Sequence, residues 1–285
     1  MSTSPDRRTP RVVTLAVTSG KGGVGKTNVV VNLAVGLARL RNRVAILDAD
    51  FGLGNVDVLL GLAPEGHLGH VLAGDKTIEE IVVEGPHGVR IVPASSGLRQ
   101  LTALTSQHWR RLSEGLVSLA EDLDFLLIDT AAGISDNVIE LLLTSERVLI
   151  VTSPEPTAVV DAYAMVKILT ATDPTAEIGV LVNGVRDTSE ADLVFRQLDV
   201  AAGRFLHRQL RYYGFVANDP AVRDSVIVQR PVMDHMPQSP ASRCFRILAS
   251  RIAGLSPLGG SGLRLVRRLG PAGEEESGTE APQCA

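Results

Sequence analysis

Eight consecutive residues offer the clearest chemistry in this chain. They match the pattern G-x-x-x-x-G-K-T and read Gly20-Lys21-Gly22-Gly23-Val24-Gly25-Lys26-Thr27. Glycines let a backbone fold around a polyphosphate, so that successive N–H groups and a following helix N-terminus face the anion. In such a loop Lys26 neutralises the β- and γ-phosphates, and the hydroxyl of Thr27 binds Mg²⁺. The motif predicts a nucleoside triphosphate site; the alternative is a glycine-rich turn without a ligand.

Carboxylates occur at two places where phosphate chemistry needs a metal ligand or a base. Asp129 ends the apolar run 125–129, and an aspartate in that context commonly acts on Mg²⁺ through water. Asp48 and Asp50 close the run 45–50, where a carboxylate can orient an attacking water. The alternatives are an N-cap or loop role for Asp129 and two solvated loop aspartates at positions 48 and 50.

A second lysine inside the loop, Lys21, is unusual. One lysine suffices for an ordinary phosphate loop, and Lys21 adds a flexible cation beside it. A cation that reaches the phosphates of a neighbouring subunit acts like an arginine finger supplied in trans. Lys21 and Lys26 are therefore candidate catalytic cations.

These residues need elements that bring them to one edge of a sheet. Apolar runs typical of strands alternate with helical periodicity down to about residue 253. The strand candidates are residues 12–18, 43–48, 89–93, 125–129, 148–152, 178–183 and 211–216. The helical candidates are residues 26–40, 107–121, 136–144, 156–171, 189–202 and 239–253. Ser239-Pro240 opens the last of them as an N-cap followed by proline.

Alternation of this kind predicts an α/β fold with a doubly wound, mostly parallel sheet flanked by helices. Aromatic residues make up only 4% of the chain, and aliphatic residues suit a sheet that is covered on both faces. Ligands of such sheets lie beyond the carboxyl ends of the strands. The phosphate loop, Asp48, Asp129 and Asn183 all follow strand candidates. Residues 52–96 are richer in glycine and predict a lobe or long connection on the ligand side.

The loop resembles the deviant phosphate loop of the MinD/ParA family of ATPases, through residues 21–27. Residues 48–50 resemble the second aspartate motif of that family, and residues 129–133 its metal-site strand end. Asn183 matches the family's adenine-binding asparagine; without the resemblance it would be interpreted as a turn residue. The family pattern covers residues 12–253, nearly the whole folded chain.

The resemblance implies a slow ATPase that uses ATP and Mg²⁺. Lys21 then crosses the interface of an ATP-sandwich homodimer, and Asp48 orients the hydrolytic water. Asp50 supports the metal site and the switch, while Asp129 and Thr27 serve Mg²⁺.

Within the family, the chain is similar to the FlhG branch, also called FleN or YlxH, which controls the number and placement of bacterial flagella. Residues 48–62, 91–97 and 129–134 carry this similarity. MinD itself typically has arginine where this chain has Gly54. Many FlhG proteins begin with a D-Q-A-x-x-L-R motif that stimulates the GTPase FlhF. Residues 1–10 lack that motif, so the resemblance does not extend to stimulation of the GTPase.

Composition limits the location and cofactors of the protein. The two cysteines, Cys244 and Cys284, are far apart, so neither a disulfide framework nor a metal spacing is visible and a reducing cytoplasm is expected. The same absence excludes an iron–sulfur reductase or cluster carrier. Residues 1–11 have no apolar core and do not predict a signal peptide. No apolar stretch approaches the ~20 residues that span a bilayer.

The chain divides into four predicted regions. They are a flexible N-terminus over residues 1–11, a P-loop ATPase domain over 12–256, an amphipathic segment over 257–270 and a disordered acidic tail over 271–285. On a helical wheel, one side of the amphipathic segment is apolar and carries Leu263, Leu265, Val266 and Leu269. Arginines occupy the other side, a pattern typical of a helix lying on an anionic membrane at the inner face of the cell. The alternative is a solvated basic segment.

Two hypotheses for function share the ATP-dependent homodimer. In the first, the protein is a switch: ATP opens a surface to partners, and hydrolysis releases them. Those partners would be a flagellar GTPase, a transcriptional activator or a basal-body component. In the second, the dimer is mainly a binding module that restrains a transcriptional activator, and turnover is incidental.

A third hypothesis is a positioning ATPase unrelated to flagella, including a DNA-segregation protein of the ParA type. DNA binding needs a basic surface, and the formal net charge is −4. The residues that suggest such a surface are Arg204, His207, Arg208 and Arg211. Nucleic acid is therefore not an expected partner.

Overall fold

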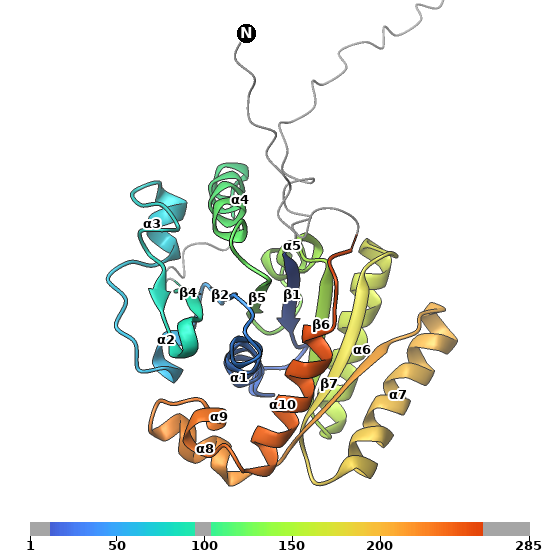
Figure 1. Ribbon diagram of the computed structural model, residues 1–285. Coiled ribbons are helices and arrows are strands. Elements are labelled where there is room, and N and C mark those ends of the chain that lie inside the picture. Colours follow the sequence, from blue (N-terminus) through green and yellow to red (C-terminus); the bar gives the residue numbers. More distant parts are fainter. Residues whose placement is uncertain (1–11, 95–103, 259–285) are drawn as a thin grey trace, which may run out of the picture.

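A central sheet of eight strands organises the molecule (Figure 1). The computed structural model describes residues 12–94 and 104–258. The strand order is β3-β4-β2-β5-β1-β6-β7-β8, and every pairing is parallel except the one between β3 and β4. The strands are β1 Val13–Thr18, β2 Val44–Ala49, β3 Val83–Glu84, β4 Arg90–Val92, β5 Phe125–Thr130, β6 Arg147–Thr152, β7 Glu177–Val185 and β8 Arg211–Ala217.

Helices cover both faces of the sheet. The α-helices are α1 Lys26–Arg39, α2 Val56–Leu59, α3 Leu68–Ala73, α4 Ser106–Ala120, α5 Asp136–Thr144, α6 Pro156–Thr172, α7 Thr188–Leu206, α8 Pro220–Ile227, α9 Val232–His235 and α10 Pro240–Ala253. One short 3₁₀ helix, η1, spans Pro86–Gly88. One apolar core packs α3 to α7 on the sheet, and the other packs α1, α9 and α10 on the opposite face.

The sequence explains why these layers close tightly. All side chains of β1, β2 and β5 are buried, which is the state that continuous aliphatic strands favour in a parallel sheet. Helices α1 and α10 lie side by side on the same face of the sheet, as Figure 1 shows. A Cβ on Gly36 would lie 2.7 Å from the Cβ of Ala249, so this glycine permits the close approach of the two helices.

The predicted α/β sheet is confirmed, and so are all seven strand candidates and all six helical candidates, with boundaries that shift by a few residues. Sequence periodicity missed six short elements, namely β3, α2, α3, η1, α8 and α9. The longest of them, α8, has eight residues, too few for a period to show. Residues 52–96, predicted as a lobe or connection, contain four of these elements and also β4. The apolar side of the tail, Leu263, Leu265, Val266 and Leu269, lies outside the described residues.

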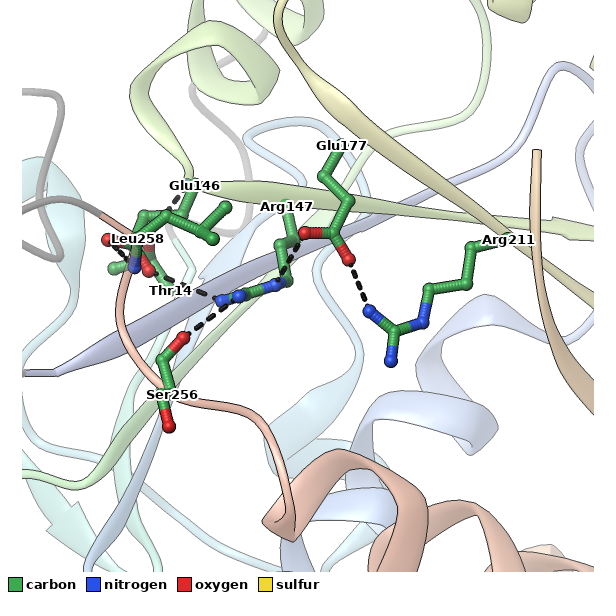
Figure 2. A network of polar contacts seen from close by, with 7 residues as sticks. All are labelled: Thr14, Glu146, Arg147, Glu177, Arg211, Ser256 and Leu258. Carbon is green, nitrogen blue, oxygen red and sulfur yellow. Dashed lines mark hydrogen bonds and ion pairs between the residues drawn. The ribbon is translucent and has the colours of Figure 1, made fainter. Parts of the chain in front are cut away.

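A buried polar network fixes the end of the described chain to the sheet (Figure 2). Arg147 starts β6, and its guanidinium donates to a carboxylate oxygen of Glu177 at 3.2 Å and to the carbonyl of Ser256 at 2.8 Å. Its neighbour Glu146 accepts from the backbone N–H of Leu258 at 2.9 Å. The Glu146 and Arg147 side chains are 0% and 4% exposed. Because these strands are parallel, the network lies at the amino ends of the sheet.

Candidate functional site

The phosphate loop joins β1 to α1 at the carboxyl end of the central strand. Gly25 is the N-cap of α1 and has a φ of 89°, in the left-handed region that favours glycine. A Cβ there would also lie 2.4 Å from Nδ2 of Asn183. Glycine is therefore required at position 25 for both conformation and space. Lys26 and Thr27 begin the helix, where free N–H groups favour an anion.

A cavity of about 540 Å³ opens beside this loop, a volume within the usual range of small-molecule sites. Its lining includes Lys21, Gly23, Asn183, Arg186, Glu190 and Asn218. The sequence predicted Lys21, Gly23 and Asn183 as site residues. It did not predict Arg186, Glu190 and Asn218. Arg186, Glu190 and Asn218 follow the carboxyl ends of β7 and β8, so the rule that ligands lie beyond strand ends was the signal that would have found them.

Asn183 is held against the phosphate loop. Its Nδ2 donates to the carbonyl of Val24 at 2.7 Å. The side chain belongs to β7, two strands away from β1 in the sheet. The structure thus brings the predicted adenine-binding residue to the loop, and the recognition of the base stays a prediction.

Asp48 and Asp129 lie side by side on β2 and β5, which pair in register at these two residues. They are 1% and 2% exposed. Asp48 accepts the backbone N–H of Asp50 at 3.2 Å through one oxygen and that of Val56 at 3.1 Å through the other. Burial, and next the charge of Asp129, raise the pKa of Asp48 to about 8. The site therefore contains a carboxyl group whose pKa is close to neutral pH, as proton transfer requires.

Asp129 contacts the hydroxyl of Thr27, another predicted metal ligand. Burial raises its pKa to about 7, although the Thr27 hydroxyl and the Lys26 ammonium lower it. Its Oδ1 is buried and has no hydrogen-bond partner among the described residues, which is costly for a polar atom unless a ligand satisfies it.

This orphaned oxygen fits Mg²⁺. The cation prefers oxygen ligands and usually takes one or two carboxylates together with phosphate oxygens and water. The described ranges contain no group of three or more His, Cys, Asp or Glu side chains that could hold a metal alone. Asp129 and Thr27 would hold Mg²⁺ with the nucleotide phosphates, and the cation would neutralise negative charge there.

Asp50 has a different environment from the other two aspartates. Its Oδ1 accepts the backbone N–H groups of Gly52 at 3.2 Å and Leu53 at 3.0 Å. The carboxylate thereby shapes the turn that follows β2. Its charge also reaches Asp129, whose pKa it raises. A supporting role at the metal site stays a prediction.

Lys21 has partners that sequence reasoning did not find. Its Nζ lies 2.5 Å from a carboxylate oxygen of Glu155 and 3.0 Å from the hydroxyl of Thr157. Both partners come from the loop and first turn that follow β6. The side chains of Lys21 and Glu155 are 38% and 65% exposed, and ion pairs so open to water are weak. Lys21 is thus held by its own chain in a contact that breaks at little cost.

Comparisons with known proteins agree with this geometry. A family model described as "ParA: NUBPL iron-transfer P-loop NTPase" matches residues 12–253. Antiactivator FleN of Pseudomonas aeruginosa is 42% identical over 241 residues, which are 85% of this chain and 86% of FleN. The flagellum site-determining protein YlxH of Helicobacter pylori is 34% identical over 213 residues, 73% of this chain and 71% of YlxH. The structure of MinD from Pyrococcus horikoshii with Mg-ADP has a TM-score of 0.72 at 25% identity, over 85% of this chain and 96% of MinD.

The parallel sheet, the glycine loop and the paired strand-end aspartates define a P-loop nucleoside triphosphatase. The chain belongs to the ParA/MinD family of P-loop NTPases, is FlhG-like within it and is an ATPase. Its described part contains a single cysteine, Cys244, as a free thiol. No helix within residues 12–94 and 104–258 is long and apolar enough to cross a membrane.

Proposed function

We propose that this protein is an ATP-dependent homodimeric switch that regulates the number or placement of flagella from the cytoplasm. The observation that carries this proposal is the similarity to FleN and YlxH over most of the chain, combined with a second lysine at the mouth of the nucleotide cavity. The printed name of YlxH concerns the site of the flagellum, and a second lysine is useful where two nucleotide sites face each other.

Exposed apolar side chains support a dimer on the nucleotide side. Leu53 and Ile134 follow the carboxyl ends of β2 and β5, and Val160 lies in the first turns of α6. They are 68%, 51% and 66% exposed. Large apolar side chains exposed at one end of a sheet are typical of a surface that another protein covers. In the dimer, Lys21 exchanges its weak contact with Glu155 for the phosphates of the partner subunit.

The residues of the site divide the work of hydrolysis. Lys26 and the loop N–H groups bind the phosphates, and Thr27 and Asp129 would hold Mg²⁺, which would neutralise the phosphate charge. Asp48, fixed by two backbone N–H groups, orients the attacking water. Asp48 lies beside Asp129 on the sheet and is not part of the phosphate loop. A mutation of Asp48 should therefore affect the positioning of water and leave the binding of the phosphates in place.

A second candidate function is a binding module in which ATP holds the dimer and turnover is incidental. The printed name of FleN, an antiactivator, favours this alternative. In that case the partner is a transcriptional activator, whereas a switch also fits a flagellar GTPase or a basal-body component.

We also propose that residues 257–270 bring the ATP dimer to the inner face of an anionic membrane. The support is the sequence pattern alone: Leu263, Leu265, Val266 and Leu269 alternate with Arg264, Arg267 and Arg268.

Dimerisation is tested by measuring mass in solution with saturating Mg·ATP. Asp48→Ala should trap the dimer, because the group that orients water is gone. Lys21→Ala in that background should return a monomer, while Lys167→Ala, which removes an exposed lysine of α6, should leave the dimer intact. Lys26→Ala should lose ATP binding and serves as the negative control. A monomeric Asp48→Ala protein would contradict the sandwich dimer.

The two functions are separated in cells that lack the gene and carry one variant each. Flagella are counted by electron microscopy. A switch needs turnover, so Asp48→Ala should fail to restore the normal number. A binding module needs only the dimer, so the same variant should restore it. An unchanged number of flagella in the deletion strain would contradict both.

A further inference from the structure

The nucleotide cavity extends away from the two buried carboxylates of the site. Asp48 and Asp129 lie on β2 and β5, on one side of β1 and its phosphate loop. The cavity opens on the other side, where its lining comes from the ends of β6, β7 and β8 and from the residues that follow them. A nucleotide with its phosphates in the loop and its metal end beside Asp129 therefore extends its base toward β7 and β8.

Arg186 lies at the part of the cavity that the base reaches. Neighbouring strands of a sheet are about 4.8 Å apart, and β7 is two strands away from β1. Arg186 directly follows β7 and lines the cavity. Two strand spacings place the end of β7 roughly 10 Å from the end of β1 along the sheet edge. The β- and γ-phosphates stay in the loop after β1, so the base is the part of the nucleotide that comes to Arg186.

Glu190 holds the Arg186 side chain in one orientation. One carboxylate oxygen of Glu190 accepts the backbone N–H of Arg186 at 2.7 Å, and the other lies 3.0 Å from its Nε and 2.9 Å from its Nη2. The Glu190 side chain is 18% exposed and belongs to the first turn of α7, where its backbone N–H donates to Asp187 at 2.9 Å. Because one edge of the guanidinium is bound to this carboxylate, the direction of its plane is fixed.

The pairing with Glu190 decides which part of a nucleotide suits Arg186. A carboxylate in contact with the guanidinium offsets its charge and leaves it little attraction for a phosphate. The planar face still stacks on an aromatic ring, which is a property of arginine more than of lysine. The Arg186 side chain is 78% exposed, so a ring in the cavity has access to this face.

We propose that Arg186 is a nucleobase-binding residue of the ATP site, with its guanidinium plane stacked on the base and its orientation fixed by Glu190. The predicted contact of Asn183, which holds the phosphate loop through the carbonyl of Val24, is with the edge of the base. Arg186 covers the face. The proposal rests on the nucleotide site and requires neither the homodimer nor the regulatory switch.

Arg196 provides a matched control. It is an exposed arginine of α7, the helix that carries Glu190, and it is not among the described residues that line the cavity. Arg196→Ala removes the same side chain and the same charge as Arg186→Ala. A loss that occurs only in Arg186→Ala is therefore specific to the place of Arg186 in the cavity.

The test compares Mg·ADP with ribose 5-diphosphate, which has a hydroxyl in place of the base. Diphosphates are used because the proposed dimer needs a γ-phosphate, so a change in dimerisation does not enter the result. Dissociation constants are measured by competition against labelled ADP. The proteins are the wild type, Arg186→Ala, Arg186→Lys, Glu190→Gln, Arg196→Ala and the Arg186→Ala/Glu190→Gln double variant.

The base should account for the whole effect of Arg186. Arg186→Ala should weaken ADP binding about 3- to 10-fold, the effect of a cation at a partly exposed ring. Its Kd for ribose 5-diphosphate should stay within about twofold of the wild type, which also shows that the variant is folded. Arg186→Lys keeps the charge without the plane and should lose nearly as much ADP affinity as alanine. Arg196→Ala should match the wild type.

The Glu190 variants test the orientation of Arg186. Glu190→Gln should weaken ADP relative to ribose 5-diphosphate by a smaller factor than Arg186→Ala, because the guanidinium stays but is held less firmly. Adding Glu190→Gln to Arg186→Ala should change the ratio of the two dissociation constants no further. A further change would show that Glu190 acts on the base without Arg186 and would overturn its part in the proposal.

Two other results would overturn the role of Arg186. One is an equal loss of ADP and ribose 5-diphosphate affinity in Arg186→Ala; recovery by Arg186→Lys would then assign the cation to a phosphate. The other is wild-type ADP affinity in Arg186→Ala. A wild-type protein that binds neither ligand would instead contradict the nucleotide site on which the proposal rests.

Discussion

At the scale of single residues, the site depends on two aspartates with equal burial and different partners. Asp48 uses both oxygens to accept backbone N–H groups. Asp129 leaves one buried oxygen without a partner beside Thr27 and Lys26. A carboxylate whose oxygens are already bonded is held in one orientation, whereas an unsatisfied one is ready for a cation. These contacts agree with a positioning role for Asp48 and a metal role for Asp129.

The raised pKa of Asp48 predicts how stability changes with pH. In the folded protein the pKa of this carboxyl is about 8, so it keeps its proton to about that pH, while in the unfolded chain it loses the proton near its ordinary pKa of 3.8. The folded state binds more protons between these values, so its stability is full at low pH and is lost as pH rises toward 8. Without nucleotide and Mg²⁺, we expect Asp48 to contribute a loss on the order of 1 kcal/mol per pH unit from pH 5 to pH 8.

Urea unfolding at several pH values measures this slope. Asp48→Asn cannot titrate and should make the slope shallower by on the order of 1 kcal/mol per pH unit, while Asp129, whose pKa is raised to about 7, maintains the rest of it up to about that pH. Asp122→Asn, which changes a carboxylate that is 74% exposed, should not. Parallel curves for the wild type and Asp48→Asn would show that Asp48 is already ionised in the folded protein.

At the scale of elements, the sequence correctly predicted the strands and helices that have a clear hydrophobic period. The strand-end rule correctly placed the phosphate loop, Asp48, Asp129 and Asn183 at one edge, because parallel strands bring their carboxyl ends together. It did not reveal that Glu155 holds Lys21. That contact depends on a side-chain rotamer and on the loop after β6, neither of which has a periodic pattern. The tight packing of Gly54 on Asp48 likewise needs coordinates.

The buried network at the amino ends of β6 and β7 predicts a large stability effect. Arg147→Ala should leave Glu146 buried without its cationic neighbour and free the carbonyl of Ser256. Removing one partner of a buried ion pair costs about 3–5 kcal/mol. Arg211→Ala is the matched control, because Arg211 also pairs with Glu177 but its side chain is 52% exposed; its cost should stay under about 1 kcal/mol. Urea unfolding compares the two, and equal losses would contradict a stabilising role for the buried contacts.

At the scale of the whole molecule, the sheet separates two ends with different roles. The nucleotide cavity lies beyond the carboxyl ends of the strands. The network of Glu146 and Arg147 lies at the amino ends and binds Ser256 and Leu258 there (Figure 2). The chain after residue 258 therefore starts at the end of the sheet opposite to the nucleotide.

This arrangement refines the test of membrane binding. Four apolar side chains in residues 263–269 bury too little surface for one copy to hold on a bilayer. Two copies on one dimer make the second contact intramolecular and raise the effective affinity by about 10²-fold or more. We expect Mg·ATP, but not ADP, to sediment the protein with anionic liposomes.

Truncation after Leu258 should abolish sedimentation and keep the network intact, whereas truncation after Ser256 would also remove the backbone N–H of Leu258, which donates to Glu146. Lys21→Ala, which should not dimerise, should stay in the supernatant with either nucleotide, and equal sedimentation with ATP and ADP would contradict coupling between the dimer and the membrane.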